Sequence, residues 1–254
     1  MPRASSYPVP ALEKGLDIIE ALAAASVPQS LTELAARLER SSSELFRMLN
    51  CLEQRGYLHR DELSGKYTLT LKLYTLAHTH SLAGKLAAAA RRPMQALTET
   101  FRESCHLSIL ERRQLLVLAQ HESPDPVRLS IEVGGLFDPV RTASGRLLLA
   151  YLNEGELTAA LAASPSGRAL GPRPLTALKG TLAGIRKLGL SSADSETIEG
   201  VRDLAVVVGS PADGIVGALA VTRLTRRDSQ PKDAPLVEAM QAAAREITAT
   251  LGLR

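Results

Sequence analysis

The spacing of apolar residues near the N-terminus restricts the fold of this chain more than any other feature. Apolar residues recur at intervals of three or four in three short segments, residues 11–25, 31–38 and 41–55. This period predicts three amphipathic helices. Their expected buried positions include Leu12 and Leu16 in the first segment.

A hairpin signal follows the third helix directly. Gly56 suits a helix end, and two strand-like runs, 57–60 and 66–69, lie on either side of a turn at 61–65. The Ser64-Gly65 pair in this turn supplies the chemistry of a hairpin. Residues 1–70 are therefore predicted to form a winged helix-turn-helix domain, of which residues 1–10 are a loose arm.

The third helix has the two faces that DNA reading requires. Leu45, Leu49 and Leu52 can pack on the other helices, while Arg47 and Asn50 lie opposite. Such a helix fits the major groove, and its N-terminal N–H groups suit a phosphate. We expect DNA contacts from the turn, the helix and the hairpin: Arg40, Ser41, Ser42, Ser43, Glu44, Arg47, Asn50, Arg60 and Lys66. The alternative is that these are solvated polar faces of a small helical bundle.

Charge alone does not decide between these two interpretations. The chain of 254 residues has a net charge of +3, but residues 1–80 hold nine Lys and Arg against nine Asp and Glu. A DNA-binding segment with no net charge must act through a few well-placed cations. Arg47 is the residue that we expect to contact guanine or phosphate.

The second half predicts a mixed α+β domain. Strands are expected at 106–110, 115–120, 127–133, 205–209 and 216–221, and helices at 82–103, 144–152, 154–162, 176–187 and 235–251. This order suggests an antiparallel sheet flanked by helices. A linker helix at 71–84 would join the two domains, and 163–174, rich in Pro and Gly, is expected to be an exposed loop.

The sequence offers little sign of enzyme chemistry. It contains neither a phosphate-binding loop motif nor G-x-S-x-G, and we expect no catalytic residue, metal or cofactor. His106 beside Cys105 is expected on a strand rather than in a metal site. Two lone cysteines and no long apolar segment predict a cytoplasmic protein without a membrane span. Two alternatives to a DNA-binding protein remain. One is an enzyme acting on small organic acids with an accessory helical domain, and the other is a protein-interaction module.

Several stretches resemble the IclR family of bacterial transcription regulators. In the first domain they are ALEKGLDIIEAL, SLTELAARL, SSSELFRMLNCLEQRGYL and GKYTLTLKLYTLA. In the second they are HLSIL, VRLSIEVGGLFDPVRTASGRLLLAYL and SETIEGVRDLAVVV. The resemblance covers about residues 10–252. Glu39-Arg40 replaces the usual Gly-Leu of the turn and Ser43-Glu44 the usual Ser-Thr, so the family's target sequence does not carry over.

The resemblance implies a GAF-like effector domain that binds a small organic acid at the helix start Thr142-Ala143-Ser144-Gly145. By position, the expected ligand-binding residues are Leu129, Val133, Thr142, Ala143, Ser144, Gly145, Asp203, Ala220 and Thr222. The alternative for Thr142 and Ser144 is a plain helix cap. Asp203 would repel an acid, so it either binds a hydroxyl or amine or points away. The resemblance also implies a homodimer or homotetramer on a near-palindromic double-stranded DNA operator.

Overall fold

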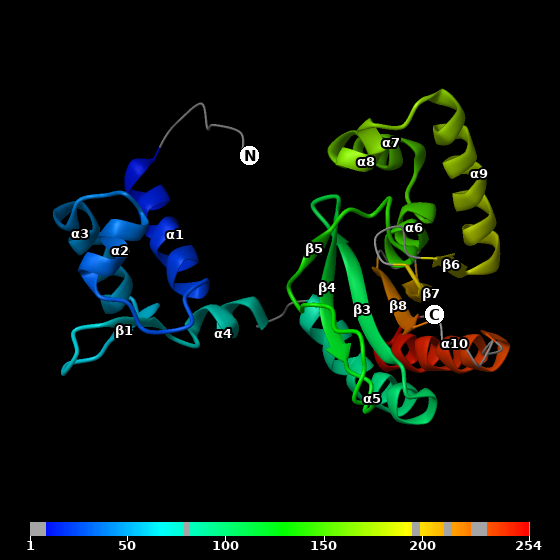
Figure 1. Ribbon diagram of the computed structural model, residues 1–254, viewed down its shortest axis with the longest axis horizontal. Helices are drawn as coiled ribbons and strands as arrows, with labels where there is room; N and C mark the ends of the chain where they lie inside the picture. Colours follow the sequence, from blue (N-terminus) through cyan, green and yellow to red (C-terminus); the bar gives the residue numbers. More distant parts are fainter. Residues whose placement is uncertain (1–8, 79–81, 195–198, 211–214, 225–232, 254) are drawn as a thin grey trace. The chain divides into compact units, whose positions relative to one another are not determined.

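The computed structural model describes residues 9–78, 82–194, 199–210, 215–224 and 233–253. The chain divides into two compact units, residues 1–80 and 81–254 (Figure 1). Each unit has its own hydrophobic core.

The N-terminal unit has three helices, a hairpin and a fourth helix. In order they are α1 (Pro10–Ala23), α2 (Leu31–Arg37), α3 (Ser42–Gln54), β1 (Leu58–Arg60), β2 (Tyr67–Leu69) and α4 (Lys72–His78). The strands β1 and β2 pair antiparallel. The predicted helix-turn-helix and wing are therefore confirmed, whereas most of the predicted arm at 1–10 lies outside the described residues.

The buried face of α1 differs from the expected one. Leu12 and Leu16 are 59% and 48% exposed, while Ile18 and Leu22 are buried with Leu34, Leu45 and Leu49. The predicted stripe was therefore wrong over the first two turns. A helix with many apolar residues contains several stripes with spacings of three and four. Contact with α2, α3 and the hairpin decides which of these stripes is buried.

The turn between α2 and α3 places Glu39 at φ 53°. This left-handed conformation favours glycine, which agrees with the glycine that the resemblance leads one to expect there. The backbone keeps the tight turn although glutamate replaces glycine.

The C-terminal unit contains a six-stranded antiparallel sheet in the order β5-β4-β3-β8-β7-β6. The strands are β3 (Ser104–Glu111), β4 (Gln114–His121), β5 (Leu136–Phe137), β6 (Leu190–Asp194), β7 (Val201–Ser210) and β8 (Ile215–Leu224). One face packs on α5 (Leu82–Phe101) and α10 (Asp233–Thr250). On the other side of the sheet lie α6 (Ala143–Ala150), α7 (Glu154–Ala163), α8 (Pro165–Arg168) and α9 (Pro172–Leu188) (Figure 1).

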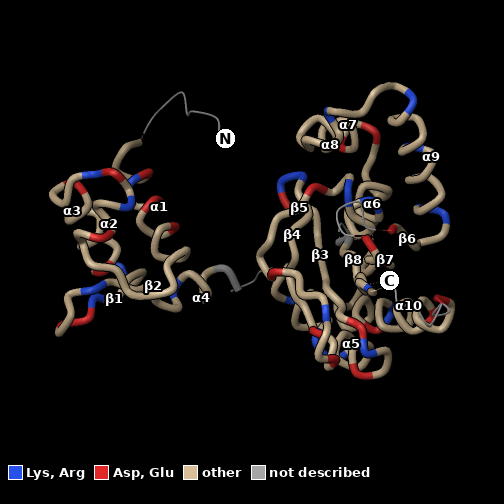
Figure 2. The backbone as a smooth tube through the Cα atoms, viewed as in Figure 1, with Lys and Arg blue, Asp and Glu red and all other residues tan. Residues whose placement is uncertain are grey.

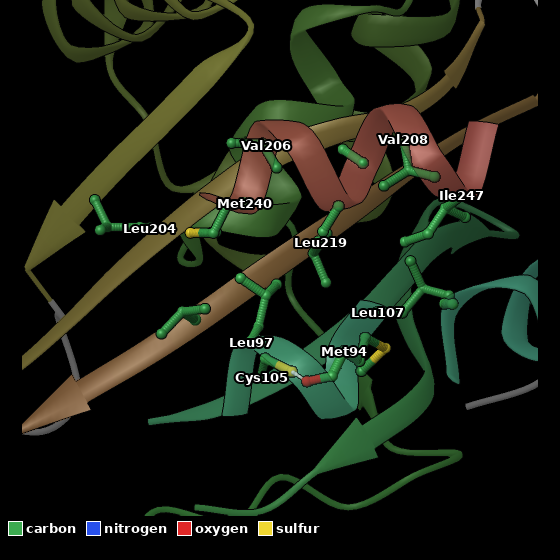
Figure 3. Close-up of a cluster of buried hydrophobic side chains, with 14 of the residues drawn as sticks. Met94, Leu97, Cys105, Leu107, Leu204, Val206, Val208, Leu219, Met240 and Ile247 are labelled. Carbon is green, nitrogen blue, oxygen red and sulfur yellow. Dashed lines mark hydrogen bonds between the residues drawn. The ribbon is translucent and has the colours of Figure 1, made fainter. Parts of the chain in front are cut away.

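Alternation along the central strands separates two cores. Cys105, Leu107, Leu219 and Val206 pack with Met94 and other side chains of α5 and α10 (Figure 3). The next residues along these strands, including Ala205, Ala218 and Ala220, pack under α6. Small alanine side chains on that face let α6 approach the sheet closely. The predicted α+β architecture is confirmed.

Two predicted segments differ from the structure. Residues 127–133 form no strand: Pro124 and Pro126 precede them, and side chains tie the segment to β4, with Gln120 Oε1 accepting the Ile131 N–H at 2.6 Å. Residues 163–174 are not a plain loop, because α8 begins at Pro165 and α9 at Pro172. Proline suits the first turn of a helix, so it marked two helix starts here.

The strand β6 was not predicted, because its sequence LSSAD lacks alternating apolar residues. None of the described helices is long and apolar enough to cross a membrane.

Candidate functional site

The start of α3 is held by a capping box formed by Ser41 and Glu44, two of the residues predicted to contact DNA. The Ser41 hydroxyl accepts the Glu44 N–H at 3.4 Å, and the Glu44 carboxylate accepts the Ser41 N–H at 3.2 Å. Lys14 of α1 lies 2.8 Å from the other carboxylate oxygen. The Lys14 hydrogen bond, then those from Ser41, lower the pKa of Glu44 from 4.5 to about 2. Glu44 is therefore engaged within the unit.

The exposed face of α3 carries the other predicted residues. Ser42, Ser43, Arg47 and Asn50 are exposed, opposite the buried Leu45 and Leu49. Among the described residues, Arg47 has no hydrogen-bond or ion-pair partner, so its guanidinium is available to an external acceptor.

The remaining predicted cations have local partners. Arg40 lies 3.4 Å from Asp17, and Lys66 lies 3.2 Å from Glu33. Arg60 lies over the Tyr67 ring at 5.7 Å. Figure 2 shows acidic and basic residues interleaved over this unit. Exposed ion pairs are weak, so a phosphate can compete for these cations.

The C-terminal unit contains a cavity of about 480 Å³ on the α6 side of the sheet. Apolar walls come from Val117, Ile131, Phe137 and other residues, and the polar lining includes Asp138 and Arg141. Five of the predicted ligand-binding residues line it: Leu129, Thr142, Ser144, Asp203 and Thr222.

The other four predicted ligand-binding residues lie outside the cavity lining. Val133 is 56% exposed and follows the lining residues 129–132 directly in the chain. Ala143 of α6 and Ala220 of β8 are buried in the core between α6 and the sheet. A Cβ on Gly145 would lie 2.2 Å from the Pro139 carbonyl oxygen, so its close approach is to backbone and not to a ligand.

Thr142 and Ser144 make different hydrogen bonds in the first turn of α6. Thr142 caps the helix, since its hydroxyl accepts the Gly145 N–H at 3.0 Å. The Ser144 hydroxyl instead lies 3.2 Å from His106 Nε2. His106 is buried in the cavity wall, and burial lowers its pKa to about 4.

Sequence reasoning placed His106 on a strand but missed its place in the cavity. The alternation of side chains along β3 could have indicated this place. His106 pairs with Ala220 and faces away from its apolar neighbours Cys105 and Leu107. A serine beside a histidine also suits nucleophilic catalysis. Here, however, a pKa of about 4 makes the imidazole a weak base, and no acidic side chain among the described residues bonds to it.

Asp203 and Thr222 form a second polar patch in the cavity wall. They are paired across β7 and β8. Neither Asp203 Oδ1 nor Thr222 Oγ1 makes a well-formed hydrogen bond within the described part of the chain, and both atoms are buried. Burial raises the pKa of Asp203, and the Thr222 hydroxyl offsets part of that rise. Buried polar atoms of this kind need a partner, and a ligand could supply it.

Both units match known protein families. Residues 11–62 match the IclR helix-turn-helix domain, and residues 79–249 match the family described as bacterial transcriptional regulator IclR C-terminal. The chain belongs to the IclR family. It is a DNA-binding transcription regulator, as the family resemblance implied.

Relatives within the IclR family span nearly the whole chain. The HTH-type transcriptional regulator KdgR of Escherichia coli is 28% identical over 87% of this chain and 85% of its own length. The glycerol operon regulatory protein of Streptomyces coelicolor is 26% identical over 96% and 97%. Both relatives are regulatory proteins.

Solved structures of IclR proteins share the fold. An IclR homologue from Microbacterium hydrocarbonoxydans, in complex with 4-hydroxybenzoate, is 25% identical, with a TM-score of 0.79 over 95% of this chain and 99% of its own. The IclR of Thermotoga maritima is 21% identical, with a TM-score of 0.73 over 95% and 98%.

Proposed function

We propose that this regulator reads a double-stranded DNA operator through the exposed face of α3 and responds to a small organic acid in the cavity. The observation that carries the proposal is that one unit supplies a surface suited to DNA and the other supplies a cavity suited to a ligand. The helix-turn-helix exposes Arg47, and the second unit holds a cavity in whose wall Asp203 Oδ1 and Thr222 Oγ1 lack a well-formed hydrogen bond; Arg47 likewise has no partner in the part of the chain that the structure describes. We place this action in the cytoplasm, where bacterial DNA lies.

The DNA contact is proposed to be local and sensitive to salt. Arg47 reads guanine or binds phosphate, Asn50 and the serines approach the groove, and Arg60 and Lys66 bind the backbone from the wing. We do not include Glu44 among the residues that contact DNA, because it caps α3 and pairs with Lys14. A homodimer or homotetramer would place two such helices on the half-sites of a near-palindrome.

The effector is proposed to be a carboxylic acid with an apolar body. A ligand carboxylate would lie near the start of α6 and Arg141, against the apolar wall that includes Phe137. A hydroxyl elsewhere on the ligand would satisfy Asp203 and Thr222. The raised pKa of Asp203 lessens its repulsion of an anion. The relative that binds 4-hydroxybenzoate supports this class of ligand.

Regulation requires that the effector bind one arrangement of the protein more tightly than another. We propose that this preference passes through the segment that contains α4 to change the spacing of the two recognition helices. Binding of acid and of DNA would then each change the affinity for the other.

The DNA contact is tested by fluorescence anisotropy on intergenic DNA beside the protein's own gene. Wild type, Arg47→Ala and Arg173→Ala are compared at several salt concentrations against scrambled DNA. Arg173 is a matched control, because it is an exposed arginine at the start of α9. Arg47→Ala should lose specific affinity and lower the salt slope by about one, whereas Arg173→Ala should match wild type. Equal binding by all three proteins would exclude Arg47 from the interface.

The effector class is tested by calorimetry with 4-hydroxybenzoate, benzoate and methyl 4-hydroxybenzoate. The acid should bind more tightly than the ester, and Thr222→Val should weaken the hydroxylated acid roughly tenfold but benzoate little. Esters that bind as tightly as acids would exclude carboxylate recognition. Release of 4-hydroxybenzoate from the ester, lost in Ser144→Ala, would instead support the enzyme alternative.

A further inference from the structure

The recognition helix α3 exposes an aromatic side chain that neither the fold nor the proposed contacts use. Phe46 is 50% exposed, in a chain that contains only three phenylalanines. It lies outside the core cluster of the N-terminal unit. Leu45 and Leu49 of the same helix already fill that core and are fully buried. A half-exposed phenylalanine loses the free energy that burial would contribute, so the residue is poorly explained by folding alone.

The neighbours of Phe46 on the helix are residues that we propose to contact DNA. Ser42 and Ser43 precede it by four and three residues and Asn50 follows by four, so all three flank it on the helix surface. Each is exposed, and the two serines are small enough to leave the ring open. Arg47 follows directly. The patch thus combines hydrogen-bonding groups with one large apolar group.

The major groove offers a matching apolar partner. Each base pair presents hydrogen-bonding groups there, and thymine adds a C5 methyl group that apolar side chains contact. The Glu44 carboxylate of the same helical turn is held by Lys14 at 2.8 Å and by the Ser41 hydroxyl at 2.9 Å, so this negative charge is engaged within the protein.

We propose that Phe46 contacts the C5 methyl group of a thymine in the operator and so determines specificity at that base pair. The inference rests on the proposed use of α3 as the recognition helix. It adds an apolar contact to the polar contacts of Arg47 and Asn50, and it identifies which kind of base the ring selects.

The test removes the methyl group from the DNA and the ring from the protein. Operator fragments are first selected from genomic DNA with the full-length protein, and each thymine is then replaced singly by deoxyuridine, which keeps every hydrogen bond. Wild type should lose roughly three- to tenfold in affinity at one thymine of each half-site. Phe46→Ala should bind the two DNAs equally, and Phe46→Leu should keep part of the difference. Asn50→Ala is the matched control: it should bind more weakly overall but remain sensitive to the methyl group.

The outcomes separate this inference from the proposed function. If wild type selects no operator, the proposed DNA reading fails. If it selects an operator but no thymine replacement weakens binding, or Phe46→Ala remains equally sensitive, the Phe46 inference fails while the regulator stands. Unfolding and mass measurements complete the test. If Phe46→Ala lowers the melting temperature or changes the oligomer, Phe46 is a packing residue and the proposal is overturned.

Discussion

Close backbone approach, rather than ligand access, explains the glycine in the first turn of α6. The Gly145 position lies against Pro139, where a Cβ would be 2.4 Å from the Pro139 Cα. Backbone atoms cannot move aside as the end of a side chain can. Gly145, which was predicted to be part of a ligand-binding motif, is therefore required by packing.

Gly145→Ala should lower the stability of the C-terminal unit by about 1–3 kcal/mol or more, because the added methyl group overpacks a buried site. Gly180→Ala in α9 is the matched control. Nothing lies within 4 Å of its added Cβ, and alanine should stabilise a helix interior by about 0.5–1 kcal/mol. Urea unfolding measures both. A wild-type midpoint for Gly145→Ala would contradict the packing role.

Buried His106 should make stability fall in mild acid. Its pKa is 6.5 in the unfolded chain and about 4 in the folded chain. As pH falls from about 6.5 toward 4, the unfolded state gains a proton that folded His106 does not, so stability is lost in that window. The raised pKa of Asp203 acts in the opposite direction: its contribution is present at low pH and is lost as pH rises.

The comparison of wild type with His106→Gln isolates the histidine, since glutamine can still bond to Ser144 but does not titrate. The free energy of unfolding should fall more steeply for wild type than for the variant between pH 6.5 and 4.5. Denaturant titrations at several pH values measure this. Parallel curves would show that burial does not shift the pKa of His106.

At the scale of elements, caps fix where the helices begin. The second, third and seventh helices start with capping boxes at Ser30, Ser41 and Asn153. The pattern Ser41-x-x-Glu44 was present in the sequence, but Glu44 was assigned to DNA contact. The cap matters most for α3, because its first turn positions the proposed recognition surface.

Ser41→Ala should destabilise the N-terminal unit by about 1 kcal/mol through loss of the cap. Ser42→Ala is the control, because Ser42 is exposed one residue later and its hydroxyl makes no hydrogen bond within the described residues. Circular dichroism during thermal unfolding compares the two variants. Equal losses would mean that the cap does not hold α3.

At the scale of the whole molecule, the two units should unfold separately. The N-terminal core is formed by Ile18, Leu34 and Leu49 with their neighbours, and the C-terminal unit has two further cores on either side of its sheet. Because each core is complete within its own unit, calorimetry should show two transitions.

Ser41→Ala should shift one transition and Gly145→Ala the other. A single transition moved by both variants would instead show that the two units unfold cooperatively.

The sequence by itself determined the features that local chemistry controls. Helical periods and the Ser64-Gly65 turn depend on neighbours only a few residues away, so the winged helix-turn-helix could be predicted in order. The proline at the starts of α8 and α9 was ambiguous, because proline suits both loops and first turns. The residues 127–133 resembled a strand, but side-chain bonds to β4 decided otherwise.

Only the tertiary structure decided which distant groups meet. Ser144 lies 38 residues from His106 in sequence, and Glu44 lies 30 residues from Lys14. Such contacts depend on how whole elements pack, and no local pattern records them. The sequence therefore determined which elements this protein has, whereas packing decided that Glu44 serves the fold, that Gly145 meets Pro139, and that His106 enters the cavity.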